Sequence, residues 1–323
     1  MLISIIIPMY NVELYIEQCL LSCLKQNLSS SCYEIIIIND GSTDNSLKIA
    51  EHIACLYNNI KIYSQKNAGL SEARNTGLKY AVGKYIWFVD SDDRIRENCL
   101  KQLLEQCESE SLDILALAAS DVVDGNEVRR FHYSNCKVLS GRELLELGEI
   151  QHCVPFSIYR RSFFVQHKLQ FYPGIFHEDS EFSPRAYYYA NRVGFTNKII
   201  YLVTINPNSI TRTVNYKKSF DCLTVARSMH LFYVEEARSL EPFFNNYISL
   251  IINNSLANFL NPPVDKTALE KAKNQYIDML YKNRLLFKYL RNSSKLKYRV
   301  EGVLFTMFPR RVITIYKFLQ IFK

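Results

Sequence analysis

An apolar run that ends abruptly in acids is the feature that most constrains this chain. Residues 85–93 read YIWFVDSDD. The aromatic and β-branched part predicts a buried strand. Because an unpaired carboxylate is costly to bury, we expect Asp90, Asp92 and Asp93 at the exit of that strand, where water or a cation can reach them. Carboxylates spaced as Asp-x-Asp can bind Mg2+ or Mn2+, and such a cation can hold a diphosphate. An ordinary acidic surface turn is the alternative reading.

Strands and helices alternate over the first third of the chain. Apolar runs predict strands at 2–7, 33–38, 60–63 and 85–89, and helical spacing predicts helices at 12–26, from the caps at 42–45 to about 57, and at 69–80. This order predicts an α/β fold with a mostly parallel, Rossmann-like sheet and flanking helices. Ligands of such sheets bind beyond the carboxyl ends of the strands. The turns at 8–11, 39–41 and 90–93 should therefore share one rim.

Composition bounds the class of protein. The chain has 323 residues, of which 48% are hydrophobic, enough for a large α/β domain with an appendage and too apolar for a disordered chain. Its nine cysteines include no Cys-x-x-Cys pair. The first predicted strand follows Met1 directly, so we expect no signal peptide, and no apolar run approaches the roughly 18 residues of a membrane span. We expect a cytoplasmic protein with reduced thiols.

Positive charge gathers at the C-terminal end. Residues 281–323 hold eleven Lys or Arg and one acid, Glu301, whereas the other 280 residues hold 28 Lys or Arg and 31 acids. Apolar residues recur there at helical spacing and are flanked by bases: Val300, Val303, Leu304, Met307 and Phe308. Nucleic acid and an anionic membrane are the partners that such a basic segment suits. The apolar spacing favours a pair of interfacial helices on anionic lipid, so we expect a membrane surface and no nucleic acid. A helix docked on the protein with a solvated basic face is the alternative.

Four motifs, in order, resemble the family-two glycosyltransferases with the GT-A fold. They are residues 4–11 (SIIIPMYN), 37–44 (IINDGSTD), 67–77 (NAGLSEARNTG) and 90–92 (DSD). Later segments, 177–182 (HEDSEF) and 208–211 (NSIT), resemble the acidic motif and the Ser-Ile-Thr segment of many members. The resemblance is dense over residues 1–95 and sparse to about 215. It implies an inverting enzyme that moves a sugar from a nucleotide diphosphate sugar to a glycan or polyprenyl-linked acceptor in cell-surface polysaccharide synthesis.

The resemblance also assigns the nucleotide site. It implies a nucleoside pocket lined by Pro8, Tyr10 and Asn11. Asp40 would accept a hydrogen bond from the imide N–H of uracil, which favours a UDP-sugar. An Asx-turn before the following glycine is the alternative for Asp40, and both roles can hold at once. Arg74 would contact the nucleotide or its phosphates, because a guanidinium forks onto anionic oxygens. A structural tether from Arg74 to Glu72 or Asp90 is the alternative.

By the same resemblance, Asp92 is the main ligand of Mn2+ or Mg2+ and Asp90 contacts the ribose or the metal. Asp93 suits an N-cap for a helix near Glu97 equally well. Asp179 would be the base that deprotonates the acceptor hydroxyl, with Glu178 holding it or touching the acceptor. The alternative for both is an acidic helix start favoured by the helix dipole. His177 stays outside the metal site, as a hydrogen-bonded neighbour, and Arg212 is a candidate diphosphate contact.

The chain should divide into a GT-A domain at 1–215, with a nucleotide half (1–95) and an acceptor half (96–215), and a helical extension at 216–323. A capping-box pattern predicts a helix from 140–143, and a helical arm at 266–288 would pack on the domain or on a second subunit of a homo-oligomer. A dehydrogenase is excluded by the lack of Gly-x-Gly-x-x-Gly. A non-catalytic nucleotide-sugar-binding protein and a sugar nucleotidyltransferase stay as alternatives. We expect a peripheral protein on the inner face of the plasma membrane.

Overall fold

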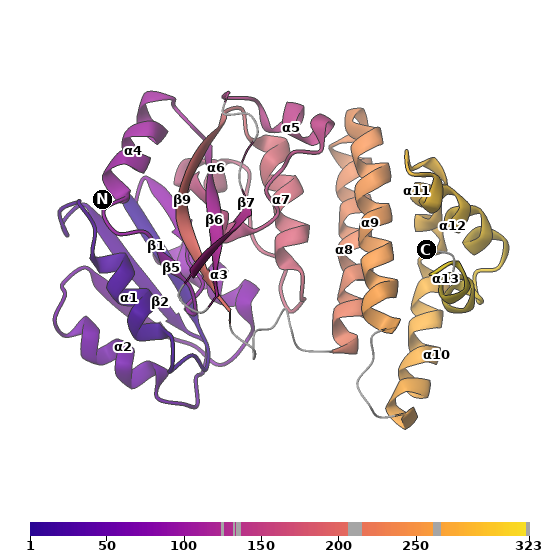
Figure 1. Cartoon of the computed structure of the whole chain (residues 1–323), viewed down its shortest axis with the longest axis horizontal. Helices are drawn as coiled ribbons and strands as arrows, with labels where there is room; N and C mark the ends of the chain where they lie inside the picture. The colour runs from indigo at the N-terminus through magenta and orange to yellow at the C-terminus, as the bar shows by residue number, and fades with distance from the viewer. Residues whose placement is uncertain (124–125, 132, 134–136, 206–214, 261–265, 321–323) are drawn as a thin grey trace. The chain divides into compact units, whose positions relative to one another are not determined.

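The computed structural model describes the chain except residues 124–125, 132, 134–136, 206–214, 261–265 and 321–323 (Figure 1). The described residues form two compact units. Unit 1 comprises Met1–Leu144, Glu149–Gly174 and Phe182–Pro207. Unit 2 comprises Leu145–Gly148, Ile175–Glu181 and Asn208–Lys323.

Unit 1 is built on one mixed sheet with the strand order β3-β2-β1-β4-β8-β6-β9-β5, and β7 pairs with β6. The four strands β1 to β4 are parallel, β8 runs antiparallel to β4 and β6, and β9 runs parallel to β6. The strands are β1 (Ile3–Met9), β2 (Tyr33–Asn39), β3 (Ile60–Ser64), β4 (Tyr85–Phe88), β5 (Arg94–Ile95), β6 (Ile114–Val123), β7 (Asn126–Phe131), β8 (Ser157–Arg160) and β9 (Val193–Thr204). The predicted α/β alternation is confirmed.

The first three helices follow the first three strands as the apolar spacing predicts, with ends that differ by a few residues. The helices of unit 1 are α1 (Ile16–Leu24), α2 (Ser46–Ala54), α3 (Leu70–Tyr80), α4 (Leu100–Ser109), α6 (Arg161–Gln166) and the 3-10 turn η1 (Val154–Phe156). Helices α5 (Gly141–Leu147) and α7 (Glu178–Tyr189) belong to it in part, because residues 145–147 and 178–181 are assigned to unit 2. Strands β1 and β2 are buried along their whole length, as expected for parallel strands covered on both faces. Helix α3 packs closely on β1, because a Cβ at Gly77 would lie 2.3 Å from Cγ2 of Ile6.

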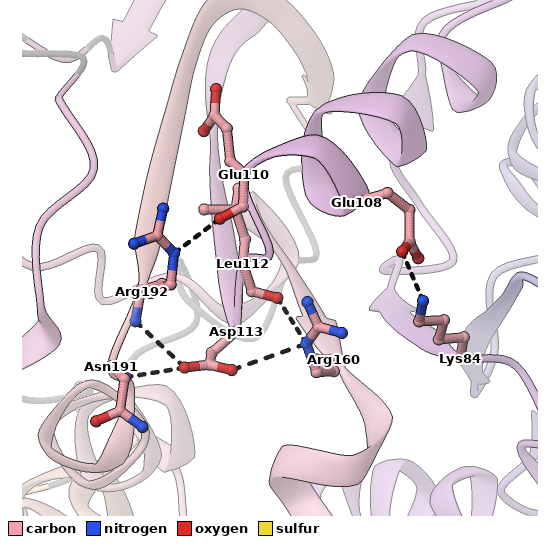
Figure 2. A network of polar contacts seen from close by, with 8 residues as sticks. All are labelled: Lys84, Glu108, Glu110, Leu112, Asp113, Arg160, Asn191 and Arg192. Atoms are coloured by element: carbon pink, nitrogen blue, oxygen red, sulfur yellow. Dashed lines mark hydrogen bonds and ion pairs between the residues drawn. The ribbon is translucent and has the colours of Figure 1, made fainter.

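A polar network lies at the end of the sheet where β6 and β9 begin and β8 ends (Figure 2). The Asp113 carboxylate accepts hydrogen bonds from the backbone N–H groups of Asn191 (2.9 Å) and Arg192 (3.2 Å) and lies 3.8 Å from Nε of Arg160. The Arg160 Nε also donates to the Leu112 carbonyl (2.9 Å). Because β4 and β6 both begin at this end, their carboxyl ends meet at the opposite rim, where the acidic turn lies.

Unit 2 is helical. Its elements are α8 (Tyr216–Glu235), η2 (Arg238–Leu240), α9 (Glu241–Leu260), α10 (Lys266–Lys282), η3 (Arg284–Leu286), α11 (Phe287–Asn292), α12 (Leu296–Met307) and α13 (Val312–Gln320). Helices α8 and α9 lie side by side (Figure 1), joined by a hydrogen bond from Ser255 Oγ to the Ser219 carbonyl (2.6 Å). The predicted arm at 266–288 is wrong in length, because α10 ends at Lys282 and a 3-10 turn follows. No helix in the described ranges is both long enough and apolar enough for a membrane span.

Candidate active site

The turns that follow β1, β2 and β4 meet at one rim of unit 1, as the strand order predicts. Met9 pairs with Asn39, and Ile6 pairs with Phe88, so the three strands end side by side. The Asp40 N–H extends the first pairing by donating to the Met9 carbonyl (2.9 Å). The rim therefore brings residues 8–11, 39–41 and 90–93 together.

Asn11 joins the first turn to the segment that leads into α2. It has a left-handed φ of 50°, and its Oδ1 accepts hydrogen bonds from the N–H (2.8 Å) and the hydroxyl (3.3 Å) of Thr43. Its own N–H donates to Ser42 Oγ (3.3 Å). Tyr10 is 49% exposed and open to a ligand, whereas Pro8 is buried inside β1. Of the three predicted pocket residues, Tyr10 and Asn11 thus face solvent and Pro8 shapes the backbone.

Asp40 anchors the loop at residues 65–69. Its side chain is 4% exposed, and its Oδ1 accepts hydrogen bonds from Gln65 Nε2 (2.7 Å) and the Ala68 N–H (2.9 Å). Its Oδ2 accepts from the N–H of Gly69 (2.8 Å), the N-cap residue of α3, which has φ of 89°. The alternative of an Asx-turn at Asp40 is not seen, because its carboxylate accepts from residues 65–69, and the Ser42 N–H donates to Asn39 Oδ1 (3.0 Å), three residues back.

Close packing holds the same loop from the other side. Gly41 has φ of 75°, and a Cβ there would lie 2.9 Å from the backbone nitrogen of Asn67. Each carboxylate oxygen can accept two hydrogen bonds, so the single N–H on Oδ2 leaves acceptor capacity for a ligand. Asp40 can therefore hold the loop and accept a further donor.

Arg74 is tethered to Asp90, as the alternative for that residue predicts. The arginine is 1% exposed, and its Nη2 lies 3.0 Å from Asp90 Oδ1. Its guanidinium carbon also lies 5.2 Å from the ring centre of Phe171. The Asp90 N–H donates to the hydroxyl of Tyr201 (3.0 Å), which comes from β9. A buried cation and a distant tyrosine thus fix the first acid of the Asp-x-Asp motif at the rim.

Asp93 does not cap a helix, so that prediction is wrong. Its carboxylate is buried and accepts a hydrogen bond from the Thr204 N–H (2.8 Å) on β9. Burial raises the pKa of Asp93, and the neighbouring Asp90 and Asp92 raise it further. Helix α4 begins at Leu100, and its N-terminus is capped by Gln26, which lies two residues after α1. Gln26 Oε1 accepts hydrogen bonds from the N–H groups of Cys99 (3.0 Å) and Leu100 (3.2 Å).

The rim offers two carboxylates, Asp90 and Asp92, to a metal. Within the part of the chain that the structure describes, no three His, Cys, Asp or Glu residues are grouped to hold an ion. Asp92 is half-buried and Asp90 is 32% exposed, and both come from one turn. Mg2+ is typically bound by one or two carboxylates together with substrate phosphates and water. The donor set of Asp90 and Asp92 fits that arrangement.

The second acidic motif belongs to unit 2, where α8 and α9 hold it. The Phe176 N–H donates to Asp221 Oδ2 (2.8 Å), the Ser228 hydroxyl donates to Glu181 Oε1 (2.8 Å), and the Tyr247 hydroxyl donates to the Ser180 carbonyl (2.7 Å). Glu178 and Asp179 lie between these anchors, in the first turn of α7. Both acids therefore sit on a segment whose backbone is held from both sides.

His177 precedes the two acids in a strained conformation. Its φ is 63°, a left-handed value that is costly for a residue with a side chain and is often found at functional sites. Burial lowers the pKa of His177, and the nearby Lys218 lowers it further, against Asp221 and Asp179. Its Nε2 is buried and makes no hydrogen bond to any residue that the structure describes. The prediction of a hydrogen-bonded neighbour is therefore wrong for Nε2.

Three contacts of the rim have no counterpart in the sequence motifs. Asp40 is contacted by Gln65, Arg74 by Phe171 and Asp90 by Tyr201. None of these three contacting residues lies in a recognisable sequence pattern. Only Gln65 is close to a motif, two residues before the segment at 67–77. The candidate Arg212 and the segment at 208–211 lie outside the described residues.

Comparison with known proteins identifies the family of the chain. The model of the family "Glycosyl transferase family 2" matches residues 4–167. An uncharacterised glycosyltransferase of Bacillus subtilis, EpsJ, is 39% identical over 230 residues, which cover 68% of this chain and 65% of EpsJ.

Two solved structures share the fold. S. aureus TarS 1–349, in complex with UDP-GlcNAc, superposes with a TM-score of 0.77 at 24% identity over 98% of this chain and 92% of that chain. The mannosyltransferase PcManGT of Pyrobaculum calidifontis, in complex with GDP-Man and Mn2+, has a TM-score of 0.55 at 12% identity over 95% and 87%. The family match and the shared fold confirm the expected GT-A architecture, and the chain belongs to glycosyltransferase family 2.

Proposed function

We propose that this protein transfers a sugar from a UDP-sugar to a hydroxyl group of a glycan or polyprenyl-linked acceptor, with inversion at the anomeric carbon, in the synthesis of a cell-surface polysaccharide. The observation that carries the proposal is the buried Arg74–Asp90 pair at a rim where Asp40 anchors the neighbouring loop. A buried cation that fixes an exposed acid is costly to build and suits a site that must present that acid in one position. The complex of TarS with UDP-GlcNAc supports a UDP-sugar as the donor.

In this proposal the nucleotide binds at the rim of unit 1. Asp40 accepts the uracil imide N–H at Oδ2, and the exposed Tyr10 and Asn11 contact the nucleoside, with Pro8 shaping the turn behind them. Asp90 contacts the ribose. Arg74 holds Asp90 and adds positive charge near the diphosphate. We assign this role to a transferase domain at 1–215, with its nucleotide half at 1–95.

Asp92 and Asp90 would hold Mn2+ or Mg2+ together with the diphosphate of the donor. The metal, when bound, neutralises the negative charge that grows on the departing diphosphate. The complex of PcManGT, which shares the fold, with Mn2+ supports a divalent cation. Asp93 takes no part, since its carboxylate is buried against β9.

Asp179 would act as the general base, with Glu178 as its neighbour at the acceptor. The acceptor oxygen forms a bond to the anomeric carbon while the bond from that carbon to the diphosphate oxygen breaks. The proton of the hydroxyl moves to Asp179, and UDP leaves with the electron pair of the broken bond. One such displacement inverts the anomeric centre. A protein that only binds nucleotide sugars has no use for this base.

The test is a screen of UDP, GDP, dTDP and CMP sugars with Mn2+, scored by nucleotide release, for the intact chain and two variants. Asp179→Asn keeps the shape and removes the base, so release should fall by about two to four powers of ten while UDP affinity persists. Glu181→Gln is the matched control, because this acid of the same turn is bonded to Ser228 and should tolerate the change. Turnover of Asp179→Asn close to that of the intact chain would move the base elsewhere. If the intact chain binds a donor but neither it nor the variants release nucleotide, a non-catalytic binding protein is favoured.

We also propose that the enzyme works as a peripheral protein on the inner face of the plasma membrane, where a polyprenyl-linked acceptor is exposed. The basic extension at 216–323 supports this location, since its last 43 residues carry eleven bases against one acid.

A further inference from the structure

Helix α12 of unit 2 has two faces of opposite character. One face is packed: Tyr298, Glu301, Gly302 and Phe305 are buried. The backbone of α11 approaches closely on this side, because a Cβ at Gly302 would lie 2.5 Å from the Arg291 nitrogen. The orientation of α12 within unit 2 is thereby fixed.

The opposite face is apolar and exposed. Its residues recur at intervals of four, three and four: Leu296 (67% exposed), Val300 (43%), Val303 (48%) and Met307 (63%), and they are followed by Phe308 (45%). At 100° per residue the first four side chains form one stripe on the side of the helix away from the packed face, and Phe308 directly follows the last residue of α12. We call these five residues the α12 stripe. The prediction from spacing placed Leu304 in this group, but it is half-buried, and the structure adds Leu296.

Only positive charge surrounds the α12 stripe within its own segment. Glu301 is the one acid of residues 281–323, and it is 0% exposed. Its carboxylate accepts a hydrogen bond from Asn253 Nδ2 (2.8 Å) and lies 3.6 Å from Nζ of Lys297. Arg299 and Arg311 are exposed on the helix and just beyond it. The surface of this segment is therefore an apolar stripe with bases beside it and no exposed acid.

Helix α13 does not share this outward surface along its length. Val312, Ile313 and Tyr316 are buried in unit 2, and the Tyr316 hydroxyl donates to the Asn253 carbonyl (3.5 Å). Phe318 of α13 is nevertheless 58% exposed, so the outward apolar surface of the predicted helix pair is mainly that of α12. Both helices are thus packed on one side within unit 2, and α12 leaves the longer apolar face exposed.

We propose that the α12 stripe docks on an anionic lipid bilayer. The inference deepens the proposed function, on whose membrane location it rests, by naming the surface that makes the contact. An interfacial helix lays its apolar face at the boundary of headgroups and acyl chains while its bases meet anionic headgroups. A second copy of the chain suits the stripe less well. Two facing copies would bring Arg299 and Arg311 of each near the same charges of the other, and about three turns give a short seam.

The experiment is sedimentation of the full chain with vesicles of phosphatidylcholine alone and with phosphatidylglycerol added, at low and high salt. We expect binding only to the anionic vesicles, weakened by salt. Val303→Ser with Met307→Ser tests the stripe, and Leu56→Ser with Val165→Ser is its control, since these two are 70% and 68% exposed on unit 1. Arg299→Gln with Arg311→Gln tests the charges. Lys48→Gln with Lys79→Gln is the control that changes the net charge equally at exposed positions.

Each test variant should lower partitioning into anionic vesicles by about ten-fold or more, and neither control should do so. Equal loss in test and control variants would overturn the docking surface, as would no binding of the intact chain. Light scattering in solution tests whether a second copy of the chain covers the α12 stripe. A dimer of the intact chain that becomes a monomer in the Val303→Ser, Met307→Ser variant would overturn lipid docking in favour of dimerisation. UDP affinity measured without vesicles keeps the proposals apart, because all variants should bind UDP as the intact chain does. If the intact chain does not bind UDP, this result counts against the proposed function and not against the docking surface.

Discussion

Nη2 of Arg74 lies 3.0 Å from Oδ1 of Asp90, and the arginine side chain is 1% exposed while the aspartate is 32% exposed. The pair therefore links the interior of α3 to the rim of the sheet. Phe171 covers the guanidinium from one side. A rim acid that is held by a buried cation cannot swing away without leaving a buried charge behind.

Removing one partner of this pair should cost stability. Arg74→Ala removes a cation that pairs with Asp90 and truncates a buried side chain beside Phe171, so we expect the free energy of unfolding to fall by about 2 to 5 kcal/mol, mainly from the cavity. Urea unfolding measures the change. Lys25→Ala is the control, since its pair with Glu97 is 60% and 56% exposed and should be worth less than about 1 kcal/mol. Equal losses for the two variants would mean that burial of Arg74 does not matter.

Asp40→Asn should weaken both the loop and the base preference. The amide has one acceptor oxygen, so its NH2 group must face either the donors at Gln65 and Ala68 or the N–H of Gly69, at a cost of about 1 to 3 kcal/mol. If Asp40 also reads uracil, the variant should lose UDP affinity and gain relative affinity for CDP, because an amide N–H can donate to N3 of cytosine. Calorimetry with both nucleotides separates the roles. Gln65→Ala, which keeps the carboxylate, should retain the preference for UDP, and a parallel fall for UDP and CDP in Asp40→Asn would leave Asp40 with the loop alone.

The effect of a metal on UDP affinity should depend on Asp92 and not on Asp93. UDP affinity of the intact chain should be higher with Mn2+ than with chelator, and Asp92→Asn should abolish the difference, because an amide oxygen carries no charge for a hard cation. Asp93→Asn keeps an oxygen for the Thr204 N–H and should leave the metal effect unchanged. Affinity that is the same in chelator and in Mn2+ for the intact chain would remove the metal from the proposal.

Glu34 should make stability depend on pH at acidic values. Burial opposes its charge, but hydrogen bonds from Ser4 Oγ (2.6 Å) and the Val82 N–H (2.9 Å) and the Lys61 ammonium outweigh it, so the pKa of Glu34 lies below its ordinary value of 4.5. An acid whose pKa is lowered by folding adds stability above its unfolded pKa, and that stability is lost as the pH falls through the folded pKa.

Glu34→Gln should therefore destabilise the protein by about 2 kcal/mol at pH 7, and the difference from the intact chain should shrink as the pH falls below about 4.5. Urea midpoints at a series of pH values measure this. Glu51→Gln, at an exposed position on α2, should follow the intact chain throughout. A difference that stays constant with pH would assign the effect to shape instead of charge.

Local patterns determined the elements of this protein. The isoleucine-rich runs of β1 and β2 mark buried strands because most of their side chains are apolar and β-branched. Ser140 and Glu143 form the predicted capping box, with the Ser140 N–H donating to Glu143 Oε2 (2.7 Å) and the Glu143 N–H to Ser140 Oγ (3.3 Å). The parallel order of the first four strands, and hence the shared rim of Asp40 and Asp90, followed from the alternation of strands and helices. Such features depend on neighbours a few residues apart, which a single sequence displays.

Partners distant along the chain were decided only by the tertiary structure. Tyr201 contacts Asp90 because β9 comes back into the sheet beside β6, and Asn75 holds Phe171 by two hydrogen bonds of 2.9 Å across 96 positions. Asp93 suited a helix cap in the sequence but contacts β9 in the structure, again because a partner distant along the chain lies beside it. The spacing in α12 indicated apolar residues on the helix, but both of its sides are apolar. Packing against α11 selected the side that is buried, because the missing side chain of Gly302 allows close approach only there.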